Sequence, residues 1–252
     1  MSSRKYTKPD PTKEDVQIDT AESDSFEPEE SVSSLETPAT KYSKAEGILK
    51  PEVFIVVFSN GEVREKNYFQ WMQRNCPKLK LEFFANPISP DDLFNDVMIK
   101  KAEYTSTTEY DTPDTYYTIT DVDHFYNDIV RSKPQYQKEG IQLIVSNPCF
   151  EVWLYYSKCS DKFDGFVKPT DPLKLSQAVK HFLNIKIPGG CNPKKAIFDI
   201  QQNIDNAKRN YSEDAQHIPS LFSTNMFLLA NDILPYLIEE IEKVRNGFSI
   251  NR

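Results

Sequence analysis

In Thr118-Ile119-Thr120-Asp121-Val122-Asp123, a β-branched run ends in two carboxylates. A second run, residues 53–58 (VFIVVF), has a similar form and leads into Asn60-Gly61-Glu62. It is apolar on both faces, as a central strand covered by helices on each side is expected to be. Both stretches therefore predict buried parallel strands that end in polar turns.

Strands and helices alternate outward from these two stretches. Further strands are expected at residues 79–85 and 141–145, and helices at 62–75, 90–103 and 123–132, the last closed by Pro134. This alternation predicts right-handed crossovers and a parallel sheet. Beyond residue 149 the pattern is helical, at residues 149–156, 171–183, 193–210 and 224–246, with Pro235 interrupting the last helix. We therefore expect an α/β fold, with a mainly parallel four-stranded sheet flanked by helices and a helical C-terminal part.

The domain organisation follows from a change in composition near residue 50. Residues 1–50 carry seven Lys or Arg and eleven Asp or Glu, with few large apolar side chains. Such a segment buries too little surface to offset its ordering entropy, which predicts a disordered acidic tail. The tail is either an interaction arm or a solvated segment without a partner. Residues 51–160 are expected to form the α/β domain, and residues 161–252 a helical part packed on it.

The overall composition restricts the function classes. The chain has 30 Lys and Arg against 38 Asp and Glu, a net charge of −8, which argues against binding nucleic acid through bulk charge. Its four cysteines form no Cys-x-x-Cys pair, which is typical of reduced cysteines in a cytosolic protein. No apolar run approaches the ~20 residues of a membrane span, and no N-terminal signal is present. We expect a soluble, cytoplasmic protein that does not bind membranes.

Three polar turns are predicted to meet at one edge of the sheet, because sites in open parallel sheets lie outside the carboxyl ends of the strands. They are Asn60-Gly61-Glu62, Asp121-Val122-Asp123 and Ser146-Asn147. Carboxylates two residues apart suit a hard cation such as Mg²⁺ or Mn²⁺. Alternatively, one Asp caps the helix that begins near His124. His124 itself adjoins the pair and could steer a proton or a phosphate.

Longer stretches around these turns resemble the RloB-like family. They are Asn60-Gly61-Glu62-Val63-Arg64-Glu65-Lys66-Asn67-Tyr68-Phe69, Asp121-Val122-Asp123 and Ser146-Asn147-Pro148-Cys149-Phe150-Glu151-Val152-Trp153-Leu154. The resemblance implies a Toprim-like domain, the fold shared by topoisomerases, primases and overcoming-lysogenization-type nucleases, in bacterial proteins associated with defence against phage. It also implies phosphodiester chemistry on DNA or RNA that depends on Mg²⁺ or Mn²⁺, with Asp121, Asp123 and Glu62 as metal ligands and catalytic carboxylates.

One position departs from the family pattern. The usual Glu-Gly-Glu after the first strand is Asn60-Gly61-Glu62 here. An amide offers a neutral oxygen to a metal but cannot act as a general base. Either Glu62 or Glu65 supplies the missing carboxylate, or the site binds metal more weakly, or catalysis is lost. Glu65 is equally interpretable as a first-turn residue that the helix dipole favours.

Two further residues have competing interpretations. Asn147 either contacts substrate or bonds a loop backbone to hold the turn before Pro148. Glu151 needs a partner or a metal if it faces the sheet edge, and needs neither on a solvent face.

Three hypotheses about function remain. The first is a metal-dependent nuclease that acts in phage defence. The second, motivated by Asn60, is a catalytically attenuated Toprim-like module of a multi-component defence system that binds nucleic acid or protein. The third, motivated by the acidic tail, is an effector held inactive by a partner protein, such as an ATPase of the same defence system.

Overall fold

The structure is a computed structural model that describes residues 53–59, 63–76, 79–85, 89–106 and 113–250. All of them belong to one compact unit, Ile48–Arg252. The expected disordered tail lies outside the described residues, and the expected domain boundary at residue 160 stays a prediction. No helix in the described ranges is long and apolar enough to cross a membrane.

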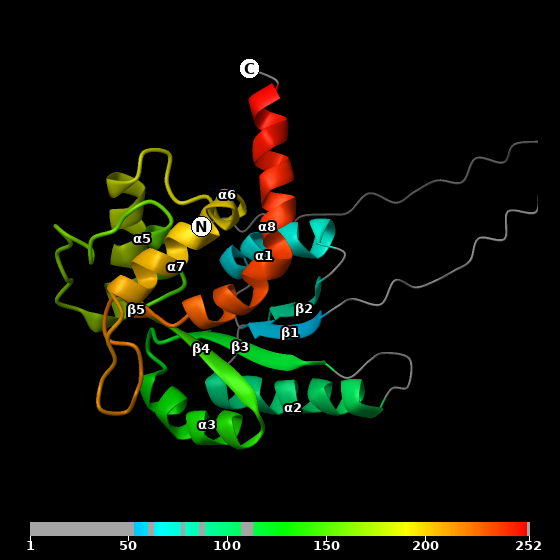
Figure 1. The fold of residues 1–252 in the computed structure, drawn as a ribbon. Coiled ribbons are helices and arrows are strands. Elements are labelled where there is room, and N and C mark those ends of the chain that lie inside the picture. The colour runs from blue at the N-terminus through cyan, green and yellow to red at the C-terminus, as the bar shows by residue number, and fades with distance from the viewer. Residues whose placement is uncertain (1–52, 60–62, 77–78, 86–88, 107–112, 251–252) are drawn as a thin grey trace, which may run out of the picture. The chain divides into compact units, whose positions relative to one another are not determined.

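The sheet contains the four predicted parallel strands in the order β2-β1-β3-β4 and a short fifth strand, β5, beside β4 (Figure 1). Their bounds are Val53–Ser59 for β1, Leu79–Ala85 for β2, Thr115–Asp121 for β3, Ile141–Asn147 for β4 and Ser223–Thr224 for β5. The first four strands pair in parallel, and β5 pairs antiparallel with the last two residues of β4. The α/β fold expected from the sequence is confirmed, with β5 as an addition.

Helices fill the connections between strands and make up most of the chain after β4. Three of them follow β1, β2 and β3: α1 (Arg64–Asn75), α2 (Pro90–Ser106) and α3 (Tyr126–Lys138). The later elements are α4 (Glu151–Tyr156), η1 (Pro172–Lys174), α5 (Leu175–Lys186), α6 (Pro193–Ala196), η2 (Ile197–Asp199), α7 (Ile200–Arg209) and α8 (Phe227–Ile250).

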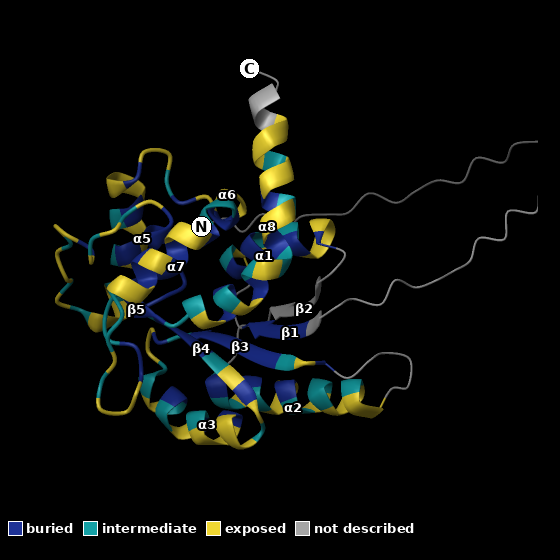
Figure 2. Ribbon diagram, in the orientation of Figure 1, coloured by how far each residue is buried: buried dark blue, intermediate teal, exposed yellow. Residues whose placement is uncertain are grey.

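Helices cover both faces of the sheet, because successive strand side chains point to opposite faces. Ile55 and Val57 of β1 belong to the largest core cluster, with side chains of α1, α4, α5, α7 and α8. Val56 and Phe58 belong to a second cluster with α2 and α3. Figure 1 shows these two helix layers above and below the strands, and Figure 2 shows the described part of β1 buried throughout. The apolar run at residues 53–58 is therefore a central strand, as predicted.

The sequence prediction for α3 was wrong, because the helix continues through Pro134 to Lys138. Proline lacks an N–H and removes one helical hydrogen bond. Packing outweighs this loss: Tyr136 is fully buried, its hydroxyl donates to the Pro90 carbonyl at 3.1 Å, and its ring meets Phe94 edge to face. Helix α8 likewise continues through Pro235.

Candidate functional site

Asp121 is the last residue of β3 and lies where the parallel strands end. It pairs in register with Ser146 of β4, and Ile119 pairs with Ser59, the last residue of β1. The carboxyl ends of β1, β3 and β4 therefore meet at one edge. Oδ1 of Asp121 is buried and lacks a hydrogen-bond partner among the described residues. A buried carboxylate oxygen of this kind is costly unless a proton or a cation satisfies it.

Asp123 is fixed by contacts from three segments. Its φ of 31° lies in the left-handed region, and its N–H donates to the Pro148 carbonyl at 2.9 Å. Its Oδ1 accepts a hydrogen bond from Ser176 Oγ of α5 at 3.0 Å. Its Oδ2 lies 3.5 Å from Nδ1 of His124. The second carboxylate of the pair is thus held beside the first at the sheet edge.

Neither member of the pair caps helix α3. The N-cap residue is Phe125, and no side chain forms a capping hydrogen bond there. The capping interpretation of the Asp pair is therefore wrong.

Two glutamates in the first turns of their helices face inward near Asp121. Glu65 of α1 is 4% exposed and Glu151 of α4 is 3% exposed. Burial, and then the charge of Glu151, raise the pKa of Glu65 to about 7, although a hydrogen bond to its own main chain opposes the shift. Burial, followed by the charges of Glu65 and Glu151, raises the pKa of Asp121 well above its ordinary value. Without a metal ion, Glu65 can therefore exchange a proton near neutral pH, and Asp121 holds its proton more tightly than an ordinary aspartate does, as the raised pKa of each carboxyl indicates.

Two cations approach the same oxygen of Glu151. Arg64 Nε and Lys180 Nζ each lie 3.7 Å from Oε1. Arg64 also donates from Nη1 to the Cys191 carbonyl at 3.0 Å, which fixes its guanidinium. Burial lowers the pKa of Lys180, but the charge of Glu151 and the other acidic groups nearby outweigh it, and the pKa is raised. Glu151 therefore faces the site and is paired there.

The site holds more acidic than basic groups. Among the described residues, two cationic side chains, those of Arg64 and Lys180, lie near four carboxyls. The carboxyls are Glu65, Asp121, Asp123 and Glu151. Carboxylate oxygens are the donors that Mg²⁺ and Mn²⁺ take, so these residues fit a hard divalent cation. Among the described residues, no three Asp, Glu, His or Cys side chains are already grouped around a metal position. Asp121 and Asp123 would supply two ligands, and the others would come from Glu62 or from water.

Comparison with known proteins places the chain in a family. A sequence profile described as RloB-like protein matches residues 55–233, which is more than half of the chain. The chain belongs to the RloB-like protein family. The matched range of this RloB-like protein includes all four carboxyls and both cations of the site. No curated protein and no solved structure matches the chain.

The predicted site residues of the RloB-like chain divide into three groups. Asn60 and Glu62 lie outside the described residues. Asp121, Asp123, Glu65 and Glu151 come together, with His124 beside them at the surface. Asn147 lies at the same strand end, but its Nδ2 donates to the Pro219 carbonyl at 2.7 Å and its carbonyl accepts from Phe222 N–H at 2.8 Å. These bonds hold the 211–222 loop; substrate contact by Asn147 stays a prediction.

The sequence did not identify Ser176 and Lys180 as residues of this site. Ser176 and Lys180 belong to α5, more than fifty residues beyond the Asp pair. The two residues are four positions apart and therefore lie on one face of the helix. This spacing is the only feature of the local sequence that relates them to each other. Nothing in the pattern around residue 176 indicates that this face meets the end of β3. Arg64 falls inside a stretch that resembles the family, but its pairing with Glu151 is a tertiary contact.

Proposed function

We propose that this RloB-like protein is a Mg²⁺- or Mn²⁺-dependent nuclease that hydrolyses phosphodiester bonds of DNA or RNA in bacterial defence against phage. The observation that carries the proposal is the buried Oδ1 of Asp121, which has no hydrogen-bond partner among the described residues and lies within a surplus of carboxyls. Asp121 and Asp123 would hold the metal ion, with Glu62 as the third carboxylate. When bound, the ion would neutralise charge on the phosphate and lower the pKa of an attacking water.

The chain's own groups have distinct roles in this proposal. Arg64 and Lys180 pair with Glu151, yet their side chains remain 40% and 49% exposed. They can therefore contact a phosphate that lies at the edge of the site. Glu65, whose pKa is about 7 in the metal-free protein, can exchange a proton near neutral pH. Ser176 holds Asp123 in position through its hydrogen bond.

Local charge supports a nucleic-acid substrate despite the acidic chain. Residues 151–210 contain ten Lys or Arg and six Asp or Glu, whereas the whole chain has a net charge of −8. This segment includes α5, which supplies Lys180 to the site. A segment with a positive net charge that brings a lysine to the acidic site can attract the phosphate backbone.

A second candidate function is a catalytically attenuated binding or effector module of a multi-component defence system. Asn60 replaces the family glutamate, and the ammonium of Lys180 already supplies positive charge to Asp121 and Glu65. Such a module would bind nucleic acid or a partner protein, such as an ATPase of the same defence system, without turnover.

The experiment that tests the nuclease proposal compares wild type, Asp121→Ala and Asp205→Ala on plasmid, single-stranded DNA and tRNA with Mn²⁺ or Mg²⁺. Asp205 is an exposed residue of α7 and serves as the matched control. Cleavage by wild type and the control that Asp121→Ala abolishes supports the proposal. Equal cleavage by all three proteins overturns the assignment of the site.

The two candidate functions separate in the variant Asn60→Glu. A gain of cleavage of about 10-fold or more would mean that the natural chain is an attenuated enzyme. Unchanged cleavage by an active wild type would mean that Glu62 or Glu65 already serves as the catalytic carboxylate.

A further inference from the structure

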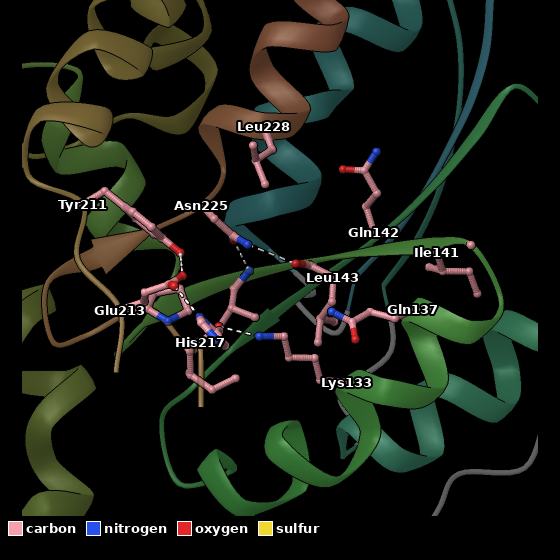
Figure 3. Close-up of a pocket in the computed structure, with 14 residues that line it drawn as sticks. Lys133, Gln137, Ile141, Gln142, Leu143, Tyr211, Glu213, His217, Asn225 and Leu228 are labelled. Atoms are coloured by element: carbon pink, nitrogen blue, oxygen red, sulfur yellow. Dashed lines mark hydrogen bonds and ion pairs between the residues drawn. The ribbon is translucent and has the colours of Figure 1, made fainter. Parts of the chain in front are cut away.

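A pocket of about 460 Å³ lies along the outer edge of β4. None of the residues that line it belongs to the carboxylate site, so the nuclease proposal gives it no role. Its walls come from α3, β4, the 211–219 loop and the start of α8. Figure 3 shows Leu228 and Asn225 on one side of the strand and Lys133 and Gln137 on the other. The volume falls in the range of ~300–1,000 Å³ typical of small-molecule sites.

Most of the outer edge of β4 is already bonded. Strand β5 covers only Ser146 and Asn147. Next to them, the Asn225 side chain bonds the main chain of β4 in the way that a neighbouring strand would. Its Oδ1 accepts from Val145 N–H at 2.6 Å, and its Nδ2 donates to the Leu143 carbonyl at 3.1 Å. The Asn225 N–H also donates to the Val145 carbonyl at 3.2 Å.

One hydrogen-bonding pair at this edge remains open. The Leu143 carbonyl points outward to Asn225, so the Leu143 N–H and the Ile141 carbonyl also point outward, because alternate residues of a strand share a side. Both residues line the pocket, and no residue in the described part of the chain bonds these two groups on that side. These two groups are therefore an adjacent acceptor and donor without a partner among the described residues; Ile141 itself is only 2% exposed, so its carbonyl meets a ligand once the side chains that cover it move aside.

Apolar and ordered polar groups form the rest of the walls. Leu228 is 41% exposed and lines the pocket, so its side chain offers an apolar surface there. On the loop side, Tyr211 donates to Glu213 at 3.0 Å, and Glu213 lies 2.5 Å from Nδ1 of His217. Lys133 donates to the carbonyls of His217 and Gln216 at 2.6 and 3.2 Å. An ammonium has three protons, so Lys133 retains one for a ligand.

We propose that this pocket binds a nucleobase, with the Ile141 carbonyl and the Leu143 N–H reading the base's adjacent donor and acceptor. Adenine fits this pair, because its amino group donates and N1 accepts. The base would pack on Leu228, and the third proton of Lys133 would meet a ribose or phosphate oxygen. An extended peptide fits less well: it needs a run of open pairs, and Asn225 closes the edge after one.

The test uses adenosine analogues titrated calorimetrically into the full chain with EDTA present, so that it is independent of the metal site. Adenosine and 7-deazaadenosine, which both keep the pair, should bind with similar affinity. N6,N6-dimethyladenosine cannot donate to Ile141, and 1-methyladenosine cannot accept from Leu143. Each should bind about 10-fold more weakly, since a buried polar group is left unpaired.

Protein variants localise the binding. Leu228→Trp, which fills the mouth of the pocket, should reduce adenosine affinity at least about 10-fold. Ile238→Trp is the matched control on α8, since Ile238 is 47% exposed and does not line the pocket. The proposal is overturned if adenosine shows no saturable binding, if the four analogues bind alike, or if both Trp variants bind as wild type does.

Competition identifies the source of the base. Displacement of adenosine by a short single-stranded oligoadenylate would mean that the pocket takes a base from a nucleic-acid strand. Displacement by adenosine monophosphate alone would mean that it takes a free nucleotide. Either result is compatible with failure of the nuclease assays, so the two proposals can fail separately.

Discussion

Ser176 Oγ donates a hydrogen bond to Asp123 Oδ1 at 3.0 Å and so ties helix α5 to the end of β3. The bond orients one carboxylate of the site from a segment 53 residues further along the chain. Hydrogen bonds of this kind orient metal-binding carboxylates, and their loss typically weakens metal affinity ~10–100-fold.

We therefore predict that Ser176→Ala weakens Mn²⁺ binding about 10-fold, and that Ser176→Thr restores most of the affinity because the hydroxyl remains. Calorimetric titration of Mn²⁺ measures both. Ser160→Ala, at an exposed position, is the control. Unchanged affinity in Ser176→Ala would show that Asp123 is not a ligand or is held in another way.

Lys180 lies close enough to Glu151 to compete with a metal ion for the negative charge of the site. Lys180→Gln is expected to tighten Mn²⁺ binding about 5-fold, because a nearby like charge is removed. The same variant should slow cleavage, since a contact to the phosphate is lost. Calorimetry and a cleavage assay give the two readouts; a parallel loss of both would assign Lys180 a purely structural role.

Glu65 links the site to stability in the metal-free protein. Its folded pKa of about 7 exceeds its ordinary value of 4.5, so the folded state binds its proton more tightly than the unfolded state. This contribution to stability is present below about pH 4.5 and is lost as the pH rises through 7. Glu65→Gln should therefore be more stable than wild type by about 1–3 kcal/mol at pH 8 and similar to it at pH 4.5.

Urea unfolding in EDTA at the two pH values measures this difference. Glu242→Gln, an exposed substitution on α8, should follow wild type at both. If the Glu65→Gln and wild-type stabilities run parallel between pH 4.5 and pH 8, then Glu65 is not protonated in the folded state near neutral pH.

Asn225 completes the edge of β4 with two side-chain hydrogen bonds, to Leu143 and Val145. Asn225→Ala leaves the Val145 N–H and the Leu143 carbonyl without these partners and should destabilise the protein by about 2–4 kcal/mol. Asn231→Ala, which removes an exposed bond from Lys208, should cost less than about 1 kcal/mol. Equal, small effects in urea unfolding would contradict the role given to Asn225.

The strands were predictable because apolar, β-branched runs of five to seven residues leave few alternatives. The beginning of β4 at Ile141 and the end of β3 at Asp121 follow from such runs, within one or two residues. Helix α3 was not, because a local rule about Pro134 was overridden by the burial of Tyr136. Local propensity is weak evidence wherever a tertiary contact of this size competes with it.

The candidate site was predictable to the extent that strand ends define it. The grouping of Asp121 with Asp123 at the sheet edge follows from the parallel topology alone. The contributions of Ser176 and Lys180 do not, since they depend on how α5 returns to that edge. From the sequence, Glu151 could face either the sheet edge or solvent. Only the packing of α4, which leaves Glu151 buried, shows that it faces the sheet edge.

Calorimetric titration of Mn²⁺ and Mg²⁺ into wild type and Asp121→Ala is the decisive test of the metal site. We predict saturable binding to wild type that is lost in Asp121→Ala and retained in Asp205→Ala. Absence of binding to wild type, or equal binding to Asp121→Ala, would contradict the account of Asp121 as a metal ligand and would favour the attenuated binding module.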